Sequence, residues 1–189
     1  DKAVTVTVTA DKNLSAARGP ERIVVKSVVG GKEHTKTITV SQYDYVWNVT
    51  YAPGTINLSP LDTHKDNIKF KCSGAWNAES DKDFVTPSPK SGNGGRDVTN
   101  TVSFEVPENY SLQDRTAVIT VASKDNSSSY SKKVTINQSK YVFDVPVTGD
   151  VEFSSSESNK VFEVKCSGTL KVSDSDKIPS WLTVTVKDG

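Results

Sequence analysis

The sequence predicts an all-β protein built from tandem immunoglobulin-like β-sandwich repeats of about 95 residues. Composition is the first observation, because Val, Ile and Thr number 26, 7 and 19, whereas Leu, Ala and Met number 6, 9 and 0. β-Branched side chains favour strands over helices. The apolar fraction of 34% is low for a globular chain. It therefore favours thin sandwiches over one deep core.

Internal self-similarity is the second observation. Three motifs recur, the first after 94 residues and the others after 96: Lys71–Gly74 at Lys165–Gly168, Tyr45–Val49 at Tyr141–Val145, and Ile38–Gln42 at Val134–Gln138. Asn13 matches Asn109 at the same offset of 96. Such a period indicates a repeat architecture.

The position of the repeat boundary is open between two divisions. In the favoured one, residues 43–138 form a complete repeat, residues 1–42 are the C-terminal half of the preceding repeat, and residues 139–189 are the N-terminal half of the following one. The alternative has units at 1–94 and 97–189, with Ser91–Gly95 as a linker. The first is favoured because Gln42–Tyr43 and Gln138–Ser139 read as junctions between successive strands.

Alternation of apolar and polar residues predicts the strands in order. The expected strand faces are Val4, Val6 and Val8; Ile23–Val25; Tyr43–Tyr51; Ile68, Phe70 and Cys72; Val102, Phe104 and Val106; Ala117–Val121; and Phe162, Val164 and Cys166. Gly30–Gly31 predicts a hairpin tip and Lys124–Ser129 a second polar tip. No window of a dozen residues shows helical periodicity.

Charge and hydropathy exclude several classes of function. Acidic and basic residues balance at 23 each, so no basic stripe is available for nucleic acid. No apolar run approaches the roughly 20 residues of a membrane-spanning helix. The chain opens on Asp1 rather than Met, which favours a processed or shortened chain. Cys72 and Cys166 occupy equivalent repeat positions, so we expect two buried free thiols rather than a disulfide.

Catalytic and metal-binding patterns are weak, and we expect no enzyme, no cofactor and no metal site. His34 and His64 both lie in polar surroundings without a neighbouring nucleophile motif. The acidic clusters Glu79–Asp83 and Asp174–Lys177 offer oxygen ligands for calcium. Each cluster contains a Lys and lacks the turn glycine of a dedicated loop, which favours solvated turns.

Aromatic residues are the best candidates for binding, because sugar rings stack on flat apolar side chains. Tyr43, Tyr51, Tyr110 and Tyr130 are the candidate ligand contacts, and Tyr43 and Tyr51 lack an aromatic counterpart in the other copy. A second group of aromatic positions stays apolar in both copies and is expected in the core: Trp47, Phe143, Trp76, Phe84 and Trp181.

The region from Ser91–Gly92 through Asn109 and Arg115 to Val134–Gln138 resembles the BACON domain, an immunoglobulin-like module associated with carbohydrate-active enzymes. The resemblance implies a non-catalytic sandwich on a secreted or cell-surface protein. We expect a structural spacer or adhesive stalk, with carbohydrate binding through exposed tyrosines as the alternative. The expected partners are neighbouring domains, glycans, or a second chain that exchanges strands with the two terminal halves.

Overall fold

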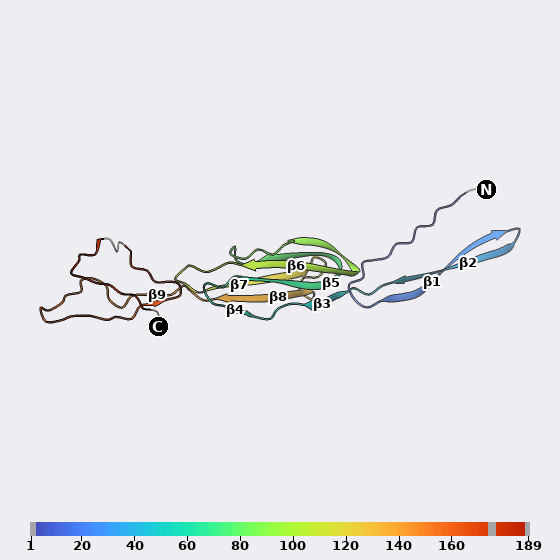
Figure 1. The fold of residues 1–189 in the computed structure, drawn as a ribbon. Helices are drawn as coiled ribbons and strands as arrows, with labels where there is room; N and C mark the ends of the chain where they lie inside the picture. The colour runs from blue at the N-terminus through green and yellow to red at the C-terminus, as the bar shows by residue number, and fades with distance from the viewer. Residues whose placement is uncertain (1–2, 174–176, 188–189) are drawn as a thin grey trace.

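The computed structural model describes residues 3–173 and 177–187, which form an elongated all-β chain (Figure 1). Strands make up 47% of the structure, and no α-helix occurs in the described ranges. Those residues accordingly contain no helix that could cross a membrane. The all-β class predicted from composition is confirmed.

An N-terminal hairpin lies at one end of the chain. β1 (Arg18–Val29) pairs antiparallel with β2 (Lys32–Gln42). Gly30 and Gly31 connect them with φ values of +57° and +77°. Glycine adopts this left-handed conformation without a steric penalty, which is why the predicted hairpin tip forms here.

The central part of the chain is a six-stranded curled sheet. Its strands are β3 (Trp47–Tyr51), β4 (Ile56–Leu58), β5 (His64–Ser80), β6 (Ser91–Val106), β7 (Arg115–Ser123) and β8 (Ser131–Gln138). The order is β3-β5-β7-β8-β4, and β6 pairs with β5. β4 runs parallel to β8, and the other pairs are antiparallel.

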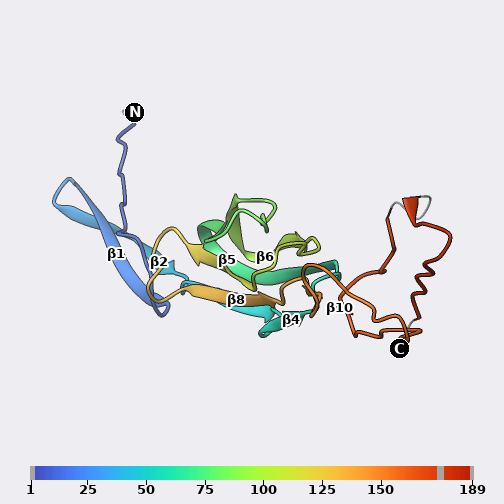
Figure 2. The same cartoon turned by 90° about the vertical axis from the view of Figure 1, so that its left-hand side faces the viewer.

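The curl arises within the long strand β5. Its first half pairs with β3, from Trp47↔Cys72 to Tyr51↔Lys69, and its second half pairs with β7, from Trp76↔Ser123 onward. A register shift between Cys72 and Ala75 separates the two halves. The two halves thus join different strands, and the structure folds into two facing layers (Figure 2).

Ser91–Gly95 lies inside β6 rather than in a linker between units. β6 crosses β5 closely here, since a Cβ built on Gly94 would lie 1.9 Å from the carbonyl oxygen of Cys72. The glycine-rich composition therefore reflects a close backbone approach.

The core lies between the two layers of the central part. Its fully or nearly fully buried members come from alternating positions: Ile68, Phe70, Cys72, Trp76, Val102, Phe104, Val106, Ala117, Ile119, Val121, Val134 and Ile136. Trp76 packs edge-on against Phe70 with ring centroids 5.2 Å apart. Its indole Nε1 donates to Asn100 Oδ1 at 3.0 Å, so its polar atom is satisfied inside the core.

Three of the five aromatics expected in the core pack there, and two do not. Trp76 is buried, and Trp47 and Phe84 are half-buried against the core. Phe143 and Trp181 are 55% and 78% exposed, so that expectation is wrong for them. Both lie in the C-terminal segment, where no second layer covers them.

The terminal segments form fewer strands than expected. Val4, Val6 and Val8 are exposed and belong to no strand. The described C-terminal residues contain only the short pair β9 (Phe143–Asp144) and β10 (Lys165–Cys166). Strand periodicity alone does not make a strand when no partner strand supplies the hydrogen bonds. Cys72 and Cys166 are both free, the first buried and the second half-buried.

Candidate functional site

The four candidate tyrosines do not converge on one platform. Tyr43 lies at the junction between the hairpin and the central sheet, and its side chain is 77% exposed. Tyr110 is 71% exposed in the loop after β6, near the opposite junction. Tyr51 lies at the end of β3, where its hydroxyl donates to Asp66 Oδ1 at 2.9 Å. That hydrogen bond raises the pKa of Tyr51.

Tyr130 is engaged by the protein itself. Its ring stacks on Tyr45 at 4.9 Å with an interplanar angle of 17°. Its hydroxyl donates to the carbonyl oxygen of Leu14 at 2.9 Å. Tyr130 therefore ties the N-terminal segment to the central sheet, and only part of its ring is open to a ligand.

Tyr43 borders a cleft of about 590 Å³ at this junction. The N-terminal segment, the chain between β2 and β3, the middle of β5, β6 and the turn after β7 contribute to its lining: Lys12, Asn13, Gln42, Tyr43, Asp44, Tyr45, Ser73, Gly74, Ala75, Arg96 and Asp125. We call this site the junction cleft.

Two ion pairs organise the junction cleft. The Arg96 guanidinium pairs with the carboxylate of Asp44 and lies 4.9 Å from the ring centroid of Tyr43. Its hydrogen bond lowers the pKa of Asp44, which keeps that carboxylate charged. On the other side, Lys12 pairs with Asp125. Asp125 reaches this position because residue 74 is glycine, since a Cβ there would lie 1.9 Å from Asp125 Oδ2.

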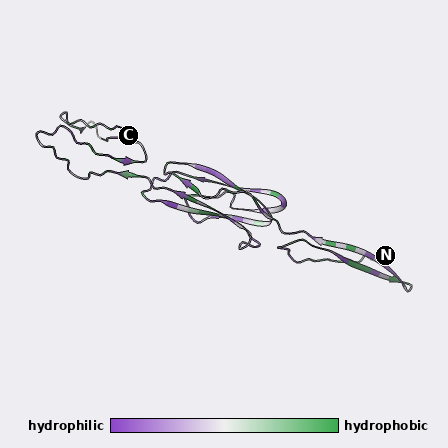
Figure 3. Ribbon diagram, turned by 90° about the horizontal axis from the view of Figure 1, so that it is seen from below, coloured by the Kyte–Doolittle hydropathy of each residue, from purple (hydrophilic) through white to green (hydrophobic). Residues whose placement is uncertain are grey.

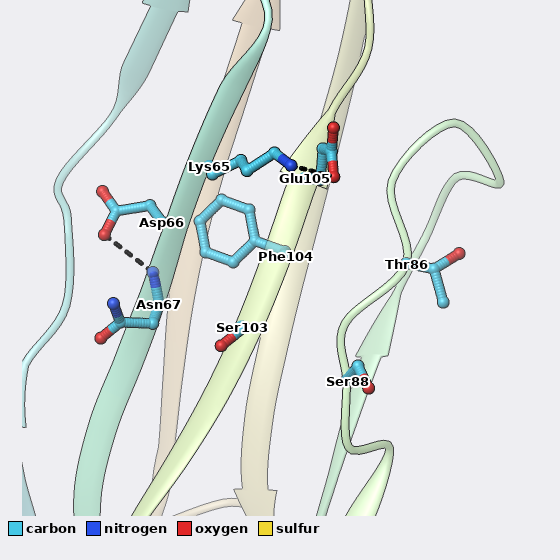
Figure 4. Close-up of a pocket in the computed structure, with 8 residues that line it drawn as sticks. All are labelled: Lys65, Asp66, Asn67, Thr86, Ser88, Ser103, Phe104 and Glu105. Atoms are coloured by element: carbon cyan, nitrogen blue, oxygen red, sulfur yellow. Dashed lines mark hydrogen bonds and ion pairs between the residues drawn. The ribbon is translucent and has the colours of Figure 1, made fainter.

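A second hollow of about 460 Å³ lies beside β5 and β6 (Figure 4). Lys65 and Glu105 form an ion pair at 3.0 Å on its rim. Asp66 Oδ1 accepts from the backbone N–H of Asn67 at 2.7 Å, whereas Asn67 Oδ1 is buried without a hydrogen-bond partner among the residues that the structure describes. Tyr51 is linked to this hollow through Asp66.

The described residues contain no group of three or more His, Cys, Asp and Glu side chains arranged to hold a metal ion. In the first acidic cluster, Asp81 Oδ1 accepts from the backbone N–H of Val118 at 2.6 Å, as part of a strand-end turn. The second cluster falls mainly on residues 174–176, which lie outside the described residues. His64 Nε2 lies 3.5 Å from Asp66 Oδ2, and His34 is exposed on β2.

The same hydrogen-bonded joint occurs at both ends of the central sheet. Asn13 and Asn109, 7% and 1% exposed, each donate to two carbonyl oxygens. The acceptors are Ala16 and Tyr43 at 2.7 and 2.8 Å in the first joint, and Gln113 and Ser139 at 2.9 Å each in the second. In each joint, one acceptor, Ala16 or Gln113, lies in the same loop as the asparagine. The other acceptor, Tyr43 or Ser139, is the first residue after the strand that leads out of the repeat. Each asparagine therefore connects successive segments of the chain.

The contacts that follow each joint are also repeated. Tyr45 N donates to Ser15 O, and Tyr141 N donates to Ser111 O, both at 2.8 Å. The Tyr45 hydroxyl lies 3.4 Å from Cys72 Sγ, and the Tyr141 hydroxyl lies 3.3 Å from Cys166 Sγ. The repeated motifs of the sequence therefore adopt the same local structure.

Sequence reasoning singled out Asn13 and Asn109 only as matching positions, and it missed the charged residues of the junction cleft. Asp44, Arg96 and Asp125 come from three separate parts of the chain, and no local motif connects them. The one sequence feature that pointed to this cleft was Gly74, which recurs as Gly168.

Comparisons with solved structures show low overall similarity. A Bacteroides ovatus GH5 xyloglucanase in complex with a XXXG heptasaccharide matches with a TM-score of 0.41 and 18% identity, over 51% of this chain and 19% of that one. Domains 4 and 5 of the S-layer protein SbsC match with a TM-score of 0.35 and 18% identity, over 64% and 58%. The chain thus spans about a fifth of the xyloglucanase chain. Among curated proteins, none matches this sequence.

The family comparison covers the second half of the central sheet. Residues 74–139 match the family model BACON, described as "Putative binding domain, N-terminal". The match runs from the second half of β5, through β6, β7 and β8, to the second joint. It contains Asn109 and Arg115, two of the residues on which the resemblance rested. The resemblance to the BACON family expected from the sequence is therefore confirmed by a family-model match over residues 74–139.

Proposed function

We propose that this chain is a non-catalytic module of a secreted or cell-surface protein, in which β-sandwich repeats joined end to end act as a spacer or adhesive stalk. Residues 43–138 form the complete repeat in this proposal, flanked by half-repeats at 1–42 and 139–189. The division is supported by the core, whose buried members all lie between Ile68 and Ile136.

The observation that carries the proposal is the Asn-centred joint, present at both ends of the central sheet. Buried side-chain hydrogen bonds to both flanking segments restrict the angle between successive units. A spacer needs this property, because a stiff joint keeps successive units extended, whereas a flexible linker lets them collapse onto each other.

The joint can be tested by measuring its stiffness with two spin labels. One is placed at Lys32→Cys on the hairpin tip and one at Thr101→Cys on β6, in a Cys166→Ser background. We expect a narrow distance distribution that broadens with Asn13→Ala. Asn159→Ala is the matched control, because Asn159 is exposed, and it should leave the distribution unchanged. A broad distribution in the parent chain would contradict a stiff stalk.

Glycan binding at the junction cleft is the second candidate function. The observation that favours it is the exposed Tyr43 ring at the mouth of a cleft lined by charged and amide groups. An exposed ring beside polar groups suits a sugar, which presents an apolar face and several hydroxyls.

Affinity gel electrophoresis against a panel of polysaccharides tests this second function. Retardation that is lost in Tyr43→Ala and kept in Tyr110→Ala would support the junction cleft, because Tyr110 lies near the other joint. Loss with Tyr51→Ala would instead assign binding to the hollow beside β5 and β6. Lack of retardation across the panel would count against a role in glycan binding.

A further inference from the structure

The hairpin exposes the counterpart of a buried face. Val25 and Ile38 are 37% and 44% exposed, whereas the residues 96 positions later, Val121 and Val134, are 0% and 1% exposed. The strand register is the same in both copies, since Ile23↔Ile38 in the hairpin corresponds to Ile119↔Val134 in the central sheet. The hairpin is therefore built like β7–β8 but lacks the opposite layer. Figure 3 shows apolar stretches along its strands.

The segment before the hairpin also exposes residues whose counterparts in the central sheet are buried. Val6 and Val8 are 60% and 48% exposed, whereas their counterparts Val102 and Phe104 in β6 are 0% and 4% exposed. In the central sheet β6 pairs with β5, where Ile68 lies opposite Val102, and this face is buried in the core. Residues 3–42 thus carry counterparts of the strands that pair with β5 and β7.

The C-terminal segment carries the complementary half. Phe162, Val164 and Cys166 lie 94 positions after Ile68, Phe70 and Cys72, which are all fully buried in β5. Phe162 is 47% exposed, and Val164 and Cys166 are half-buried. Among the described residues, this segment therefore has a counterpart of β5 but no counterparts of β6, β7 and β8.

We propose that these two faces bind each other between two copies of this chain, residues 3–42 of one copy completing residues 139–173 of the next. Within one chain they lie at opposite ends of the elongated structure and cannot meet (Figure 1). The expected pairing follows the central sheet. Phe162 lies opposite Val6 of the other copy, as Ile68 lies opposite Val102, and Val172 lies opposite Val25, as Ala78 lies opposite Val121.

Each contact uses the N-terminal face of one copy and the C-terminal face of the other. A pair of copies therefore still has one unused face at each of its two ends. Association of this heterologous kind is open-ended and produces linear head-to-tail chains. A second copy is the occupant that the structure favours, because residues 3–42 repeat the residues that already bury the same face inside the central sheet. The inference holds whether the chain is a spacer or binds glycans.

Sedimentation velocity over a wide concentration range tests the association. We expect the mass to rise with concentration in multiples of 20.5 kDa. Val25→Asp should abolish that rise, because it places a charge in the proposed contact. Val24→Asp is the matched control on the same strand. Its counterpart Thr120 points away from the core layer, so association should persist. A parent chain that stays monomeric at all concentrations would overturn the proposal.

A disulfide test fixes the pairing. Lys69 lies opposite Thr101 in the central sheet, which makes Glu163 and Thr5 the corresponding pair between copies. Cross-strand neighbours lie within the range that a disulfide spans. In a Cys166→Ser chain carrying Thr5→Cys and Glu163→Cys, oxidation should give a ladder of covalent multimers on a denaturing gel. Each single substitution should give none. A covalent monomer would show closure within one chain and overturn the proposal, as would a ladder of equal intensity with the single substitutions.

Discussion

Gln138 offers a test of the difference between the complete and the incomplete copies of the repeat. It is 1% exposed at the end of β8 and accepts from Arg115 Nε at 2.9 Å and Nη2 at 2.7 Å. Its amide nitrogen faces three carbonyl oxygens, of which Asp62 O at 3.1 Å is the nearest. Gln42 is the equivalent residue of the hairpin, half-buried, with one bond to Asp11 O at 2.8 Å.

Replacing Gln138 with Ala removes the charge-assisted bonds from Arg115 and the amide bonds to the carbonyl oxygens of Ser59, Pro60 and Asp62. Hydrogen bonds to charged groups contribute about 1.5–3 kcal/mol, whereas Ser59 O and Pro60 O keep their backbone donors. Arg115 keeps its bonds to Pro107 O and Glu108 O, so its charge is not left unpaired. We therefore expect Gln138→Ala to lower the free energy of unfolding by about 3 kcal/mol.

For a unit of this size, such a loss lowers the thermal midpoint by on the order of 15 °C. Gln42→Ala should cost under about 1 kcal/mol, because its single bond lies at the surface. The assay is urea denaturation followed by tryptophan fluorescence, in which Trp47 and Trp76 report on the central sheet. Equal losses of unfolding free energy in Gln138→Ala and Gln42→Ala would refute the reasoning, because they would show that the burial of Gln138 does not determine the cost of removing it.

Two further predictions concern ionisable side chains in the central sheet. Burial, followed by the hydrogen bond with Cys72, raises the pKa of Tyr45. The stability that this tyrosine contributes is therefore full below the unfolded tyrosine pKa of about 10 and is lost as pH rises toward the higher folded value. Urea denaturation below and above pH 10 measures how much unfolding free energy is lost at alkaline pH. This loss should be smaller in Tyr45→Phe than in the parent chain. Equal losses would contradict the raised pKa of Tyr45. Cys72 should react with a thiol reagent much more slowly than the half-buried Cys166 under native conditions, as measured in Cys166→Ser and Cys72→Ser variants. Similar rates would mean that the core opens readily at β5.

Composition and periodicity predicted the all-β fold and most of the central strands, because alternation reports directly on a strand with one buried face. The same logic failed for Val4, Val6, Val8, Phe143 and Trp181. Alternation shows that a residue suits a buried face, but burial also requires a second layer, and none covers the terminal segments among the described residues. The junction cleft was beyond prediction for a related reason. Asp44, Arg96 and Asp125 meet only through the curl of β5 and the close approach at Gly74.

The two joints share their hydrogen bonds but not the side chains around them. Tyr43 and Asp44 in the first joint are replaced by Ser139 and Lys140 in the second, and Lys12 is replaced by Glu108. The asparagine bonds end on backbone carbonyl oxygens, so they tolerate these exchanges. The proposed stiffness therefore applies to both joints, whereas in the described part of the chain the Asp44–Arg96 pair and the Tyr43 ring lie at the first joint.

The double substitution Tyr43→Ser and Asp44→Lys separates these two properties by giving the first joint the side chains of the second. It removes the exposed ring and the partner of Arg96, and it places a like charge beside that guanidinium. We expect it to abolish any polysaccharide retardation while leaving the spin-label distance distribution narrow. A broadened distribution would show that the Asp44–Arg96 pair, rather than Asn13, holds the joint, and retained retardation would place the ligand outside the junction cleft.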